Sequence, residues 1–292
     1  KVDIAIGNVV GSNIFNVLFI LGVSALITPL IVNVQIIRQE VPIMIGASLL
    51  LVAFGLDGTI SRLDAAFFFG LLLAYVVFLV VQSRRASKAD AEAATDEIDT
   101  SSTWDRHWTV QVGLIAGGLV LLVLGSNWLV DAAIVFAKSM GVSDLVIGLT
   151  IVAAGTSMPE VATSILAAIR GQRDIAIGNV VGSNIFNILG CLGVAGLVAP
   201  AGLPLAQAVL TFDMWVMLAV AFACLPVFMS GREIARWEGG IFVGYYVAYT
   251  AYLILASQQH DALPAFSSVM LGFVVPITIV TLIATMLRRP ST

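Results

Sequence analysis

Charged residues are scarce in this sequence. Only 11% of its 292 residues are Asp, Glu, Lys or Arg, whereas 59% are hydrophobic, and the mean hydropathy is +1.02. A soluble domain of this length would have too few polar side chains to cover its surface, so the composition excludes that class. It indicates an all-α polytopic membrane protein.

Histidine and cysteine are also rare, with two of each in the chain. His107 and His260 fall in predicted loops, so a serine hydrolase inside the membrane would have no histidine base. Cys191 and Cys224 fall in apolar runs and are typical of small packing residues. Without His or thiolate ligands, a buried cation would be held by oxygen atoms, which suit Na⁺ and Ca²⁺ rather than transition metals.

Long apolar runs fill most of the chain. Because a helix needs about 17–25 apolar residues to cross a bilayer, we predict nine spans, near residues 8–30, 41–56, 64–82, 110–136, 144–169, 175–198, 209–229, 239–256 and 264–287. With these spans, eleven of the fourteen Lys and Arg residues fall on one side, together with the polar segment 83–108. An excess of basic residues marks the cytoplasmic side. The segment 83–108 is rich in Ala, Asp, Glu, Ser and Thr, so we predict a disordered cytoplasmic linker.

The chain repeats itself on either side of that linker. The sequence DIAIGNVVGSNIFNVL at 3–18 recurs as DIAIGNVVGSNIFNIL at 174–189, with fifteen of sixteen positions identical. Downstream, ISRLDA at 60–65 corresponds to IARWEG at 234–239. Five predicted spans separate the starts of the two copies, and an odd number reverses their direction. Inverted repeats of this kind are typical of transporters that work by alternating access, with the substrate site near the midplane.

The repeat divides the chain into four predicted parts. They are the remainder of a first inverted repeat with three helices at 1–82, the linker at 83–108, a second repeat of five helices at 109–257, and an additional C-terminal transmembrane helix at 258–292.

One apolar run is interrupted by the sequence GTSMPE at 155–160. Apart from Asp131, Glu160 is the acid that we place deep inside a span, where a charge costs roughly 2.5–3.5 kcal/mol and generally marks function. Pro159 has no N–H to donate to the carbonyl of Gly155, so we expect the helix to break here. Irregular backbone at membrane depth is tolerated where it lines a cavity, which Thr156 and Ser157 would share.

Each copy of the repeated helix carries polar residues four positions apart on one face. They are Asn8, Ser12 and Asn16 in the first copy and Asn179, Ser183 and Asn187 in the second. Polar residues among glycines also serve as contacts between membrane helices, so both interpretations are open from spacing alone. Beside an acid, and in two inverted copies, we favour cation ligands for Ser12, Asn16, Ser183 and Asn187. We expect Asn13 and Asn184 to pack between helices.

The two motifs together, GTSMPE followed by GNVVGSNIFN, resemble the α-repeat of the calcium/cation antiporters, the sodium/calcium exchanger superfamily, and most closely its compact bacterial members. The resemblance covers all but the last span. It implies two inverted halves of five helices that exchange Ca²⁺ for Na⁺. It also implies that Glu160 is one of two bridging carboxylates of the Ca²⁺ site, and that the Thr156 carbonyl contributes there. Further implied ligands are Ser157, Ser12 and Ser183 at flanking Na⁺ sites, with Asn16 and Asn187 in the centre.

The sequence departs from the family pattern in two places. The first repeat has no Gly-Thr-Ser-x-Pro-Glu helix, so the resemblance implies an N-terminally truncated first repeat missing its first two helices. Asn187 stands where some members have Asp, which bears on K⁺ co-transport and on stoichiometry.

The resemblance predicts an antiporter in the plasma membrane rather than an enzyme. Its partners would be Ca²⁺, Na⁺ and lipid, with no cofactor, no nucleic acid and no obligatory protein partner. Two alternatives stay open, namely an exchanger coupled to H⁺, in which Glu160 titrates, and a membrane scaffold that does not transport.

Overall fold

The computed structural model describes residues 3–93, 108–139 and 147–287, and these residues are almost entirely helical. Eight of the described helices are long and apolar enough to cross a membrane. Two shorter helices, Thr150–Thr156 and Met158–Ile169, pass the same test together and are bent by 58° at the break between them. Eight of the nine predicted spans are therefore confirmed, and the interrupted one is present as this bent pair.

The first half of the described chain contains three spans. Their elements are α1 (Asp3–Phe15), the π-helical turn η1 (Asn16–Leu21), α2 (Gly22–Ile27), β1 (Leu30–Ile31), η2 (Ile36–Glu40), α3 (Val41–Gly55), β2 (Thr59–Ile60) and α4 (Arg62–Ala93). Helix α4 is longer than predicted, because the first part of the expected linker, residues 83–93, continues it as a helix. The rest of that linker, residues 94–107, lies outside the described residues.

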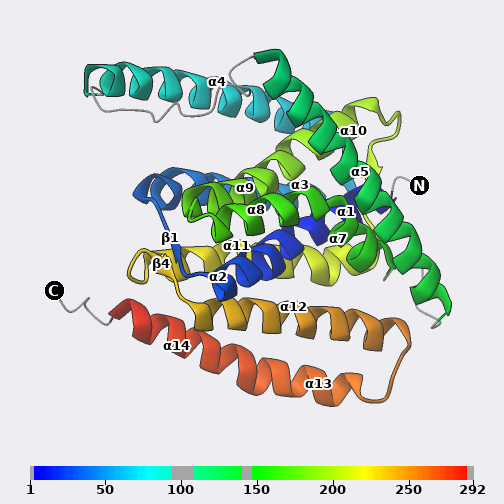
Figure 1. Ribbon diagram of the computed structural model, residues 1–292. Coiled ribbons are helices and arrows are strands. Elements are labelled where there is room, and N and C mark those ends of the chain that lie inside the picture. The colour runs from blue at the N-terminus through cyan, green and yellow to red at the C-terminus, as the bar shows by residue number, and fades with distance from the viewer. Residues whose placement is uncertain (1–2, 94–107, 140–146, 288–292) are drawn as a thin grey trace.

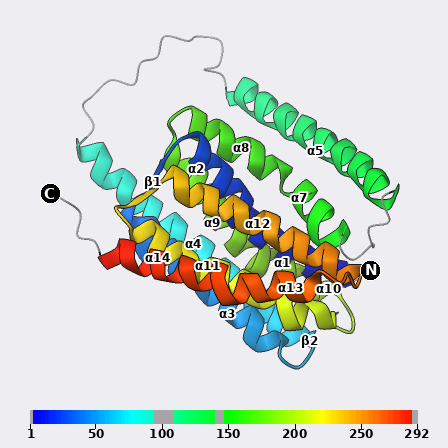
Figure 2. The same ribbon diagram turned by 90° about the horizontal axis from the view of Figure 1, so that it is seen from below.

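The second half repeats this order after two further spans. Its elements are α5 (Trp108–Ser139), η3 (Gly148–Val152), α7 (Ala153–Thr156), α8 (Met158–Ile169), α9 (Arg173–Phe186), η4 (Asn187–Leu192), α10 (Gly193–Val198), β3 (Leu203–Pro204), η5 (Val209–Asp213), α11 (Met214–Met229), β4 (Glu233–Ile234) and α12 (Arg236–Ser257). The additional C-terminal span consists of α13 (Leu263–Val269), η6 (Met270–Val274) and α14 (Val275–Leu287). It lies beside α12 in both views (Figure 1 and Figure 2).

The two halves share their irregularities as well as their sequence. The turns η1 and η4 begin at Asn16 and Asn187, the same position of the repeated motif. The turns η2 and η5 likewise precede the corresponding helices α3 and α11. A π-helical turn inserts an extra residue into a helix and is frequent at functional sites. The motif therefore imposes the same local distortion on both central helices.

Two small antiparallel sheets join the halves to each other. Strand β1 pairs with β4, so that Leu30 lies opposite Ile234, and β2 pairs with β3, so that Thr59 lies opposite Pro204. Each sheet takes one strand from each half. The prediction of a purely helical chain did not include these four two-residue strands, which form where the connections between spans run extended past one another.

Close helix contacts also cross between the halves. A Cβ atom on Gly22 of α2 would lie 3.0 Å from the carbonyl oxygen of Gly239 on α12, and one on Gly193 of α10 would lie 2.9 Å from the backbone nitrogen of Phe69 on α4. Small residues allow membrane helices to approach in this way. Helix α2 of the first half thus packs closely against α12 of the second, and α10 of the second half packs closely against α4 of the first.

The second repeated sequence proves to be a helix cap. Asp64 Oδ2 accepts hydrogen bonds from the backbone N–H of Ser61 at 2.9 Å and from its hydroxyl at 2.6 Å. Glu238 Oε2 accepts one from the N–H of Ala235 at 2.8 Å. An acid at the third helical position satisfies an amide that the helix leaves unpaired. The resemblance between ISRLDA and IARWEG therefore reflects the starts of α4 and α12.

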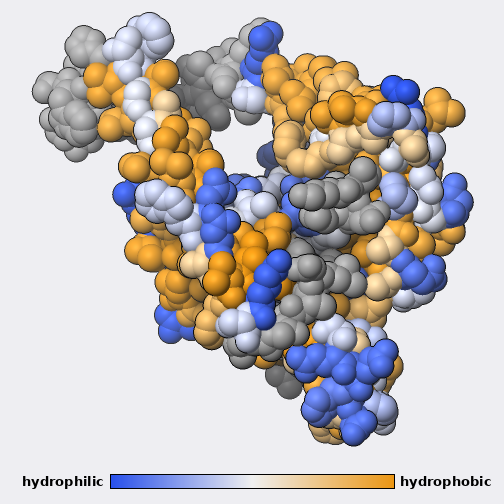
Figure 3. Space-filling view, turned by 90° about the vertical axis from the view of Figure 1, so that its right-hand side faces the viewer, coloured by the Kyte–Doolittle hydropathy of each residue, from blue (hydrophilic) through white to orange (hydrophobic). Residues whose placement is uncertain are grey.

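The central helices α1–α2 and α9–α10 form the core, and α4, α5 and α14 lie at its edges (Figure 1). The outward faces of these peripheral helices carry large exposed apolar side chains, such as Val77, Leu121 and Val280. Hydrophobic side chains cover much of the face shown in Figure 3. Such a surface is suited to lipid, and the chain is an integral membrane protein.

Candidate ion-binding site

The predicted break in the GTSMPE segment is present. Helix α7 ends at Thr156, Ser157 adopts φ −94° and ψ 8°, and α8 begins at Met158 with Pro159 in its first turn. A Cβ atom on Gly155 would lie only 1.7 Å from Cγ2 of Val130 on α5. Proline therefore fixes the start of the new helix, and the glycine allows α5 to pack directly against the break.

Hydroxyl groups from the two halves meet beside this break. Ser12 Oγ of α1 donates to the carbonyl oxygen of Ala153 at 3.2 Å and lies 3.4 Å from Thr156 Oγ1. Thr156 Oγ1 in turn lies 3.1 Å from Asn8 Oδ1. The structure thus brings together two of the predicted ligands, Ser12 and Thr156, although they are far apart in the sequence. Ser157 is buried at the bend itself.

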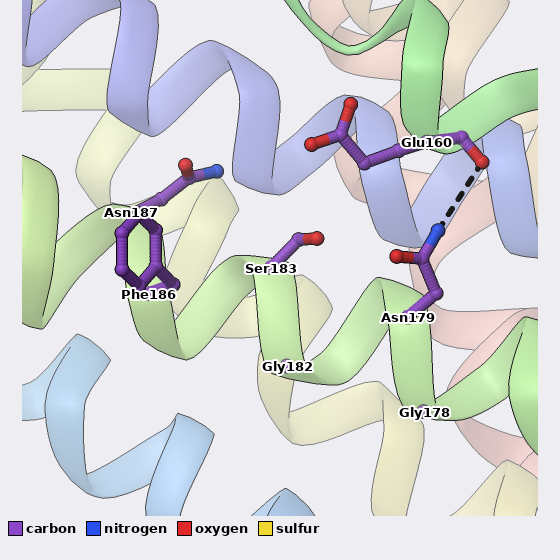
Figure 4. A pocket seen from close by; sticks show the side chains of 7 residues that line it. All are labelled: Glu160, Gly178, Asn179, Gly182, Ser183, Phe186 and Asn187. Carbon is purple, nitrogen blue, oxygen red and sulfur yellow. Dashed lines mark hydrogen bonds between the residues drawn. The ribbon is translucent and has the colours of Figure 1, made fainter. Parts of the chain in front are cut away.

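Glu160 opens onto a pocket of about 300 Å³ between α8 and α9. The residues that line it are Glu160, Gly178, Asn179, Gly182, Ser183, Phe186 and Asn187 (Figure 4). The carboxylate of Glu160, the hydroxyl of Ser183 and the amide of Asn187 surround the same space in Figure 4. Asn179 Nδ2 donates to the main-chain oxygen of Glu160 at 3.3 Å. Glu160 Oε2 is buried and has no hydrogen-bond partner among the described residues.

Four asparagines form a network where α1 and α9 cross. Asn13 Nδ2 donates to the carbonyl oxygen of Asn184 at 3.4 Å, and Asn184 Nδ2 donates to that of Asn13 at 3.2 Å. Asn16 Nδ2 donates to Asn184 Oδ1 at 2.9 Å, and Asn187 Nδ2 donates to Asn13 Oδ1 at 3.0 Å. Asn13 and Asn184 are buried and use their side chains within this interface, which agrees with the packing role predicted for them.

Asn16 and Asn187 are left with oxygen atoms that the network does not use. Asn16 Oδ1 is buried without a partner in the described part of the chain. Among the described residues, Asn187 Oδ1 accepts only a long contact of 3.9 Å from Cys191 Sγ. Because their nitrogens are held by the network, both amides are oriented with a free carbonyl oxygen, the group that binds hard cations.

The two copies of the repeated helix differ in what covers them. In α1, Gly7 and Gly11 are buried, and η3 and α7 pack against this helix. Phe15 is 2% exposed, and its ring contacts those of Phe19 and Tyr246. In α9, the equivalent Gly178 and Gly182 border the pocket, and the equivalent Phe186 is 55% exposed. Among the described residues, the pocket therefore has walls on α8 and α9. The face of α9 that borders it is uncovered, whereas the equivalent face of α1 is covered by α7.

The chemistry of the site is that of a hard-cation site with little charge. The described residues contain no cluster of three or more His, Cys, Asp or Glu side chains. Hydroxyl and amide oxygens supply most of the polar lining, and Glu160 supplies the carboxylate. Asp131 does not join this group, since its side chain is exposed on α5 and makes no hydrogen bond to a described residue.

One buried acid was missed from the sequence. Asp213, at the end of η5, is only 1% exposed and lies within the span Val209–Met229. It was overlooked because it falls near the edge of its apolar run. Alignment of the two repeats would have found it, since η2 ends at Glu40 and η5 ends at Asp213.

Comparisons with known proteins agree with this geometry. The family model described as sodium/calcium exchanger protein matches residues 1–81 and 110–255. The sodium/calcium exchanger MaX1 of Methanosarcina acetivorans is 33% identical over 281 residues, covering 86% of this chain and 80% of the relative. The inner membrane protein YrbG of Escherichia coli is 33% identical over 252 residues, covering 86% and 77%.

A solved structure extends the likeness to three dimensions. The sodium-calcium exchanger NCX_Mj, soaked with Na⁺ and Sr²⁺, superposes with a TM-score of 0.66 at 30% identity, covering 86% of this chain and 77% of the other. Its inverted repeats have the same fold as those described above. The chain therefore belongs to the sodium/calcium exchanger family, as an integral membrane cation antiporter and not an enzyme.

Proposed function

We propose that this protein moves Ca²⁺ out of the cell in exchange for Na⁺, with both ions bound in turn around the Glu160 pocket. The observation that carries the proposal is the buried Glu160 Oε2, which has no hydrogen-bond partner in the described chain. A carboxylate at this depth is costly unless a cation or a proton neutralises it. Ser183 and Asn187 present further oxygen atoms to the same space, as a hard cation requires.

The remaining expected ligands support separate positions for the ions. Asn16 and Asn187 each donate their amide nitrogen to the asparagine network, which leaves their carbonyl oxygens available for a cation. Ser12 and Thr156 form a second group of oxygens beside the helix break. Ser157 lies at the break. We assign Glu160, the Thr156 carbonyl and the central amides to Ca²⁺, and Ser157, Ser12 and Ser183 to flanking Na⁺ sites.

The open side of the pocket is the place for the second carboxylate. By the pseudo-two-fold relation, a counterpart of α7 and α8 would lie against Gly178 and Gly182 of α9, as α7 lies against α1. A Ca²⁺ site takes six to eight oxygen ligands, and Glu160 alone offsets half of its charge. We therefore expect a second Gly-Thr-Ser-x-Pro-Glu helix to complete the site in the working exchanger.

We further propose alternating access in the inner (plasma) membrane with the segment 83–108 in the cytoplasm. The inverted repeats support the first point, because exchange of conformation between related halves opens a midplane site to either side. The excess of Lys and Arg on one side supports the second. The name of the relative YrbG, an inner membrane protein, is in accord with this location.

The coupling ion is tested with ⁴⁵Ca²⁺ uptake into vesicles that contain the full-length protein. We expect uptake when the vesicles are loaded with Na⁺ and diluted into Na⁺-free buffer, and none when Na⁺ is equal on both sides. Uptake driven equally well by a pH gradient in the absence of Na⁺ would favour the H⁺-coupled alternative. No uptake under either gradient would favour a scaffold without transport.

A further inference from the structure

A second buried acid lies outside the ion pocket. Asp213 is the last residue of η5 and is 1% exposed. The phenolic O–H of Tyr249 on α12 donates to its Oδ1 at 2.7 Å, and Tyr249 is itself 6% exposed. Asp213 Oδ2 is buried and has no hydrogen-bond partner among the described residues. Neither residue lines the pocket of Glu160.

No positive charge compensates this acid within the described chain. The titratable groups that face the pair are tyrosines of α12, with Tyr249 in contact and Tyr246 beside it. Helix α1, which also packs on η5, contributes only neutral groups among its described side chains, and α11 contains no charged residue. An ionised Asp213 would therefore be an isolated charge inside the membrane, which is strongly unfavourable.

The surroundings of Asp213 also lack the ligands for a metal ion. A Ca²⁺ ion takes six to eight oxygens, whereas here one carboxyl group and one phenol meet. In the described chain, Asp213 does not belong to any group of three or more His, Cys, Asp or Glu side chains that could hold a metal ion. A proton needs only the free oxygen.

We propose that Asp213 is a proton-binding site, separate from the ion pocket, that stays occupied while the exchanger works. The proton sits on Oδ2, and Oδ1 keeps the hydrogen bond from Tyr249. Loss of this proton at alkaline pH places an uncompensated charge between η5 and α12. Helix α12 packs against α2 of the other half through Gly239 and Gly22, so the disturbance reaches the contact between halves and slows exchange.

The other half contains a natural comparison for this site. Glu40 ends η2 as Asp213 ends η5, and Tyr75 of α4 donates its hydroxyl hydrogen to Glu40 Oε2. Both residues are only half-buried, so the argument from complete burial does not apply to Glu40. Glu40→Gln is therefore the matched control for Asp213→Asn.

Infrared spectroscopy tests the proton directly and does not depend on the proposed ion specificity. The full-length protein in liposomes should show the carbonyl stretch of a protonated carboxylic acid at neutral pH. We expect Asp213→Asn to remove this band and Glu40→Gln to leave it. Tyr249→Phe should move it to higher frequency, because Oδ1 loses its donor, and this variant tests the proposal even if Asp213→Asn folds poorly. A band that is absent from the wild type, or lost in Glu40→Gln or Glu160→Gln instead, overturns the proposal.

The effect on transport rests on the proposed exchange activity and is measured separately. Wild-type ⁴⁵Ca²⁺ uptake driven by Na⁺ should fall as the pH is raised, and Asp213→Asn should remove this alkaline fall while it keeps uptake at neutral pH. An alkaline fall that persists unchanged in Asp213→Asn would refute the link between this proton and transport. Absence of uptake in every variant, together with the expected infrared band, would instead refute the proposed exchange activity.

Discussion

Asn13 and Asn184 bind each other's backbone. Each side-chain amide donates to the main-chain carbonyl of the other residue, at 3.4 and 3.2 Å. These two residues occupy the same position of the inverted repeat, so the pseudo-two-fold axis passes between them. Their side-chain oxygens accept the amides of Asn187 and Asn16, which makes this pair the support for two proposed ligands.

Removal of this support should reduce stability more than transport by each folded molecule. Asn13→Ala leaves the amide of Asn187 and the carbonyl of Asn184 without their partners. Each buried polar group left unpaired costs about 1–3 kcal/mol. We expect a lower folded yield and a lower melting temperature in detergent, with substantial ⁴⁵Ca²⁺ uptake per folded protein. A protein of normal stability that has lost transport would show that Asn13 acts on the ions directly.

Glu160→Gln should abolish Ca²⁺ transport and leave the fold intact. Glutamine keeps the size of the side chain but removes the charge that offsets the divalent ion, and loss of a charge at membrane depth does not destabilise the helix. The measurement is Na⁺-driven ⁴⁵Ca²⁺ uptake, with size-exclusion chromatography to establish folding.

Glu238→Gln provides the matched control for that change. Glu238 is another buried glutamate, but it caps α12 through the Ala235 N–H, and glutamine can cap in the same way. We expect near wild-type uptake from this variant. Transport by Glu160→Gln at the rate of Glu238→Gln would remove Glu160 from the ion site.

Gly155→Ala should destabilise the protein because α5 lies too close to accept a side chain. The new Cβ would lie 1.7 Å from Val130 Cγ2, and overpacking of this kind costs typically about 1–3 kcal/mol. Val130→Ala should restore part of the melting temperature in the double variant. Gly117→Ala on α5, where a Cβ meets nothing within 4 Å, should have little effect. Equal losses in the two glycine variants would contradict the close contact.

The topology predicts that the segment 83–108 is cytoplasmic. In a background with Cys191 and Cys224 replaced by Ser, a single cysteine at position 101 should resist an impermeant thiol reagent in intact cells and react after lysis. A cysteine at Ser139, at the end of α5, should give the reverse pattern, because one span separates the two positions. Labelling at position 101 before lysis would reverse the orientation of the whole chain.

Much of the fold could be predicted from the sequence because lipid imposes simple requirements. Nine spans follow from the lengths of the apolar runs, and the break at Ser157 follows from a proline that cannot donate a hydrogen bond. Helix α4 was predicted too short. Residues 83–93 are polar but rich in alanine and other good helix formers, so helix propensity continues the span beyond the apolar run.

The partners of individual side chains could not be predicted in this way. Spacing placed Asn13 and Asn16 on their helix, but the angle at which α1 crosses α9 decides that Asn16 binds Asn184 rather than Asn187. The strands were also hidden, because two residues carry no periodic pattern and pair only after the helices are in place. Asp213 was missed because it falls near the edge of its apolar run, and its partner Tyr249 comes from the distant helix α12.

The exchange of strands between halves has a consequence for biosynthesis. The ribosome makes β1 early, but its partner β4 follows only after nearly all of both halves. Strand β2 waits for β3 in the same way, although for a shorter stretch of chain. The first half therefore enters the bilayer with strand edges whose N–H and C=O groups have no partners, and contacts this distant in sequence form late. Neither half therefore has both of its strands paired until β4 has been made.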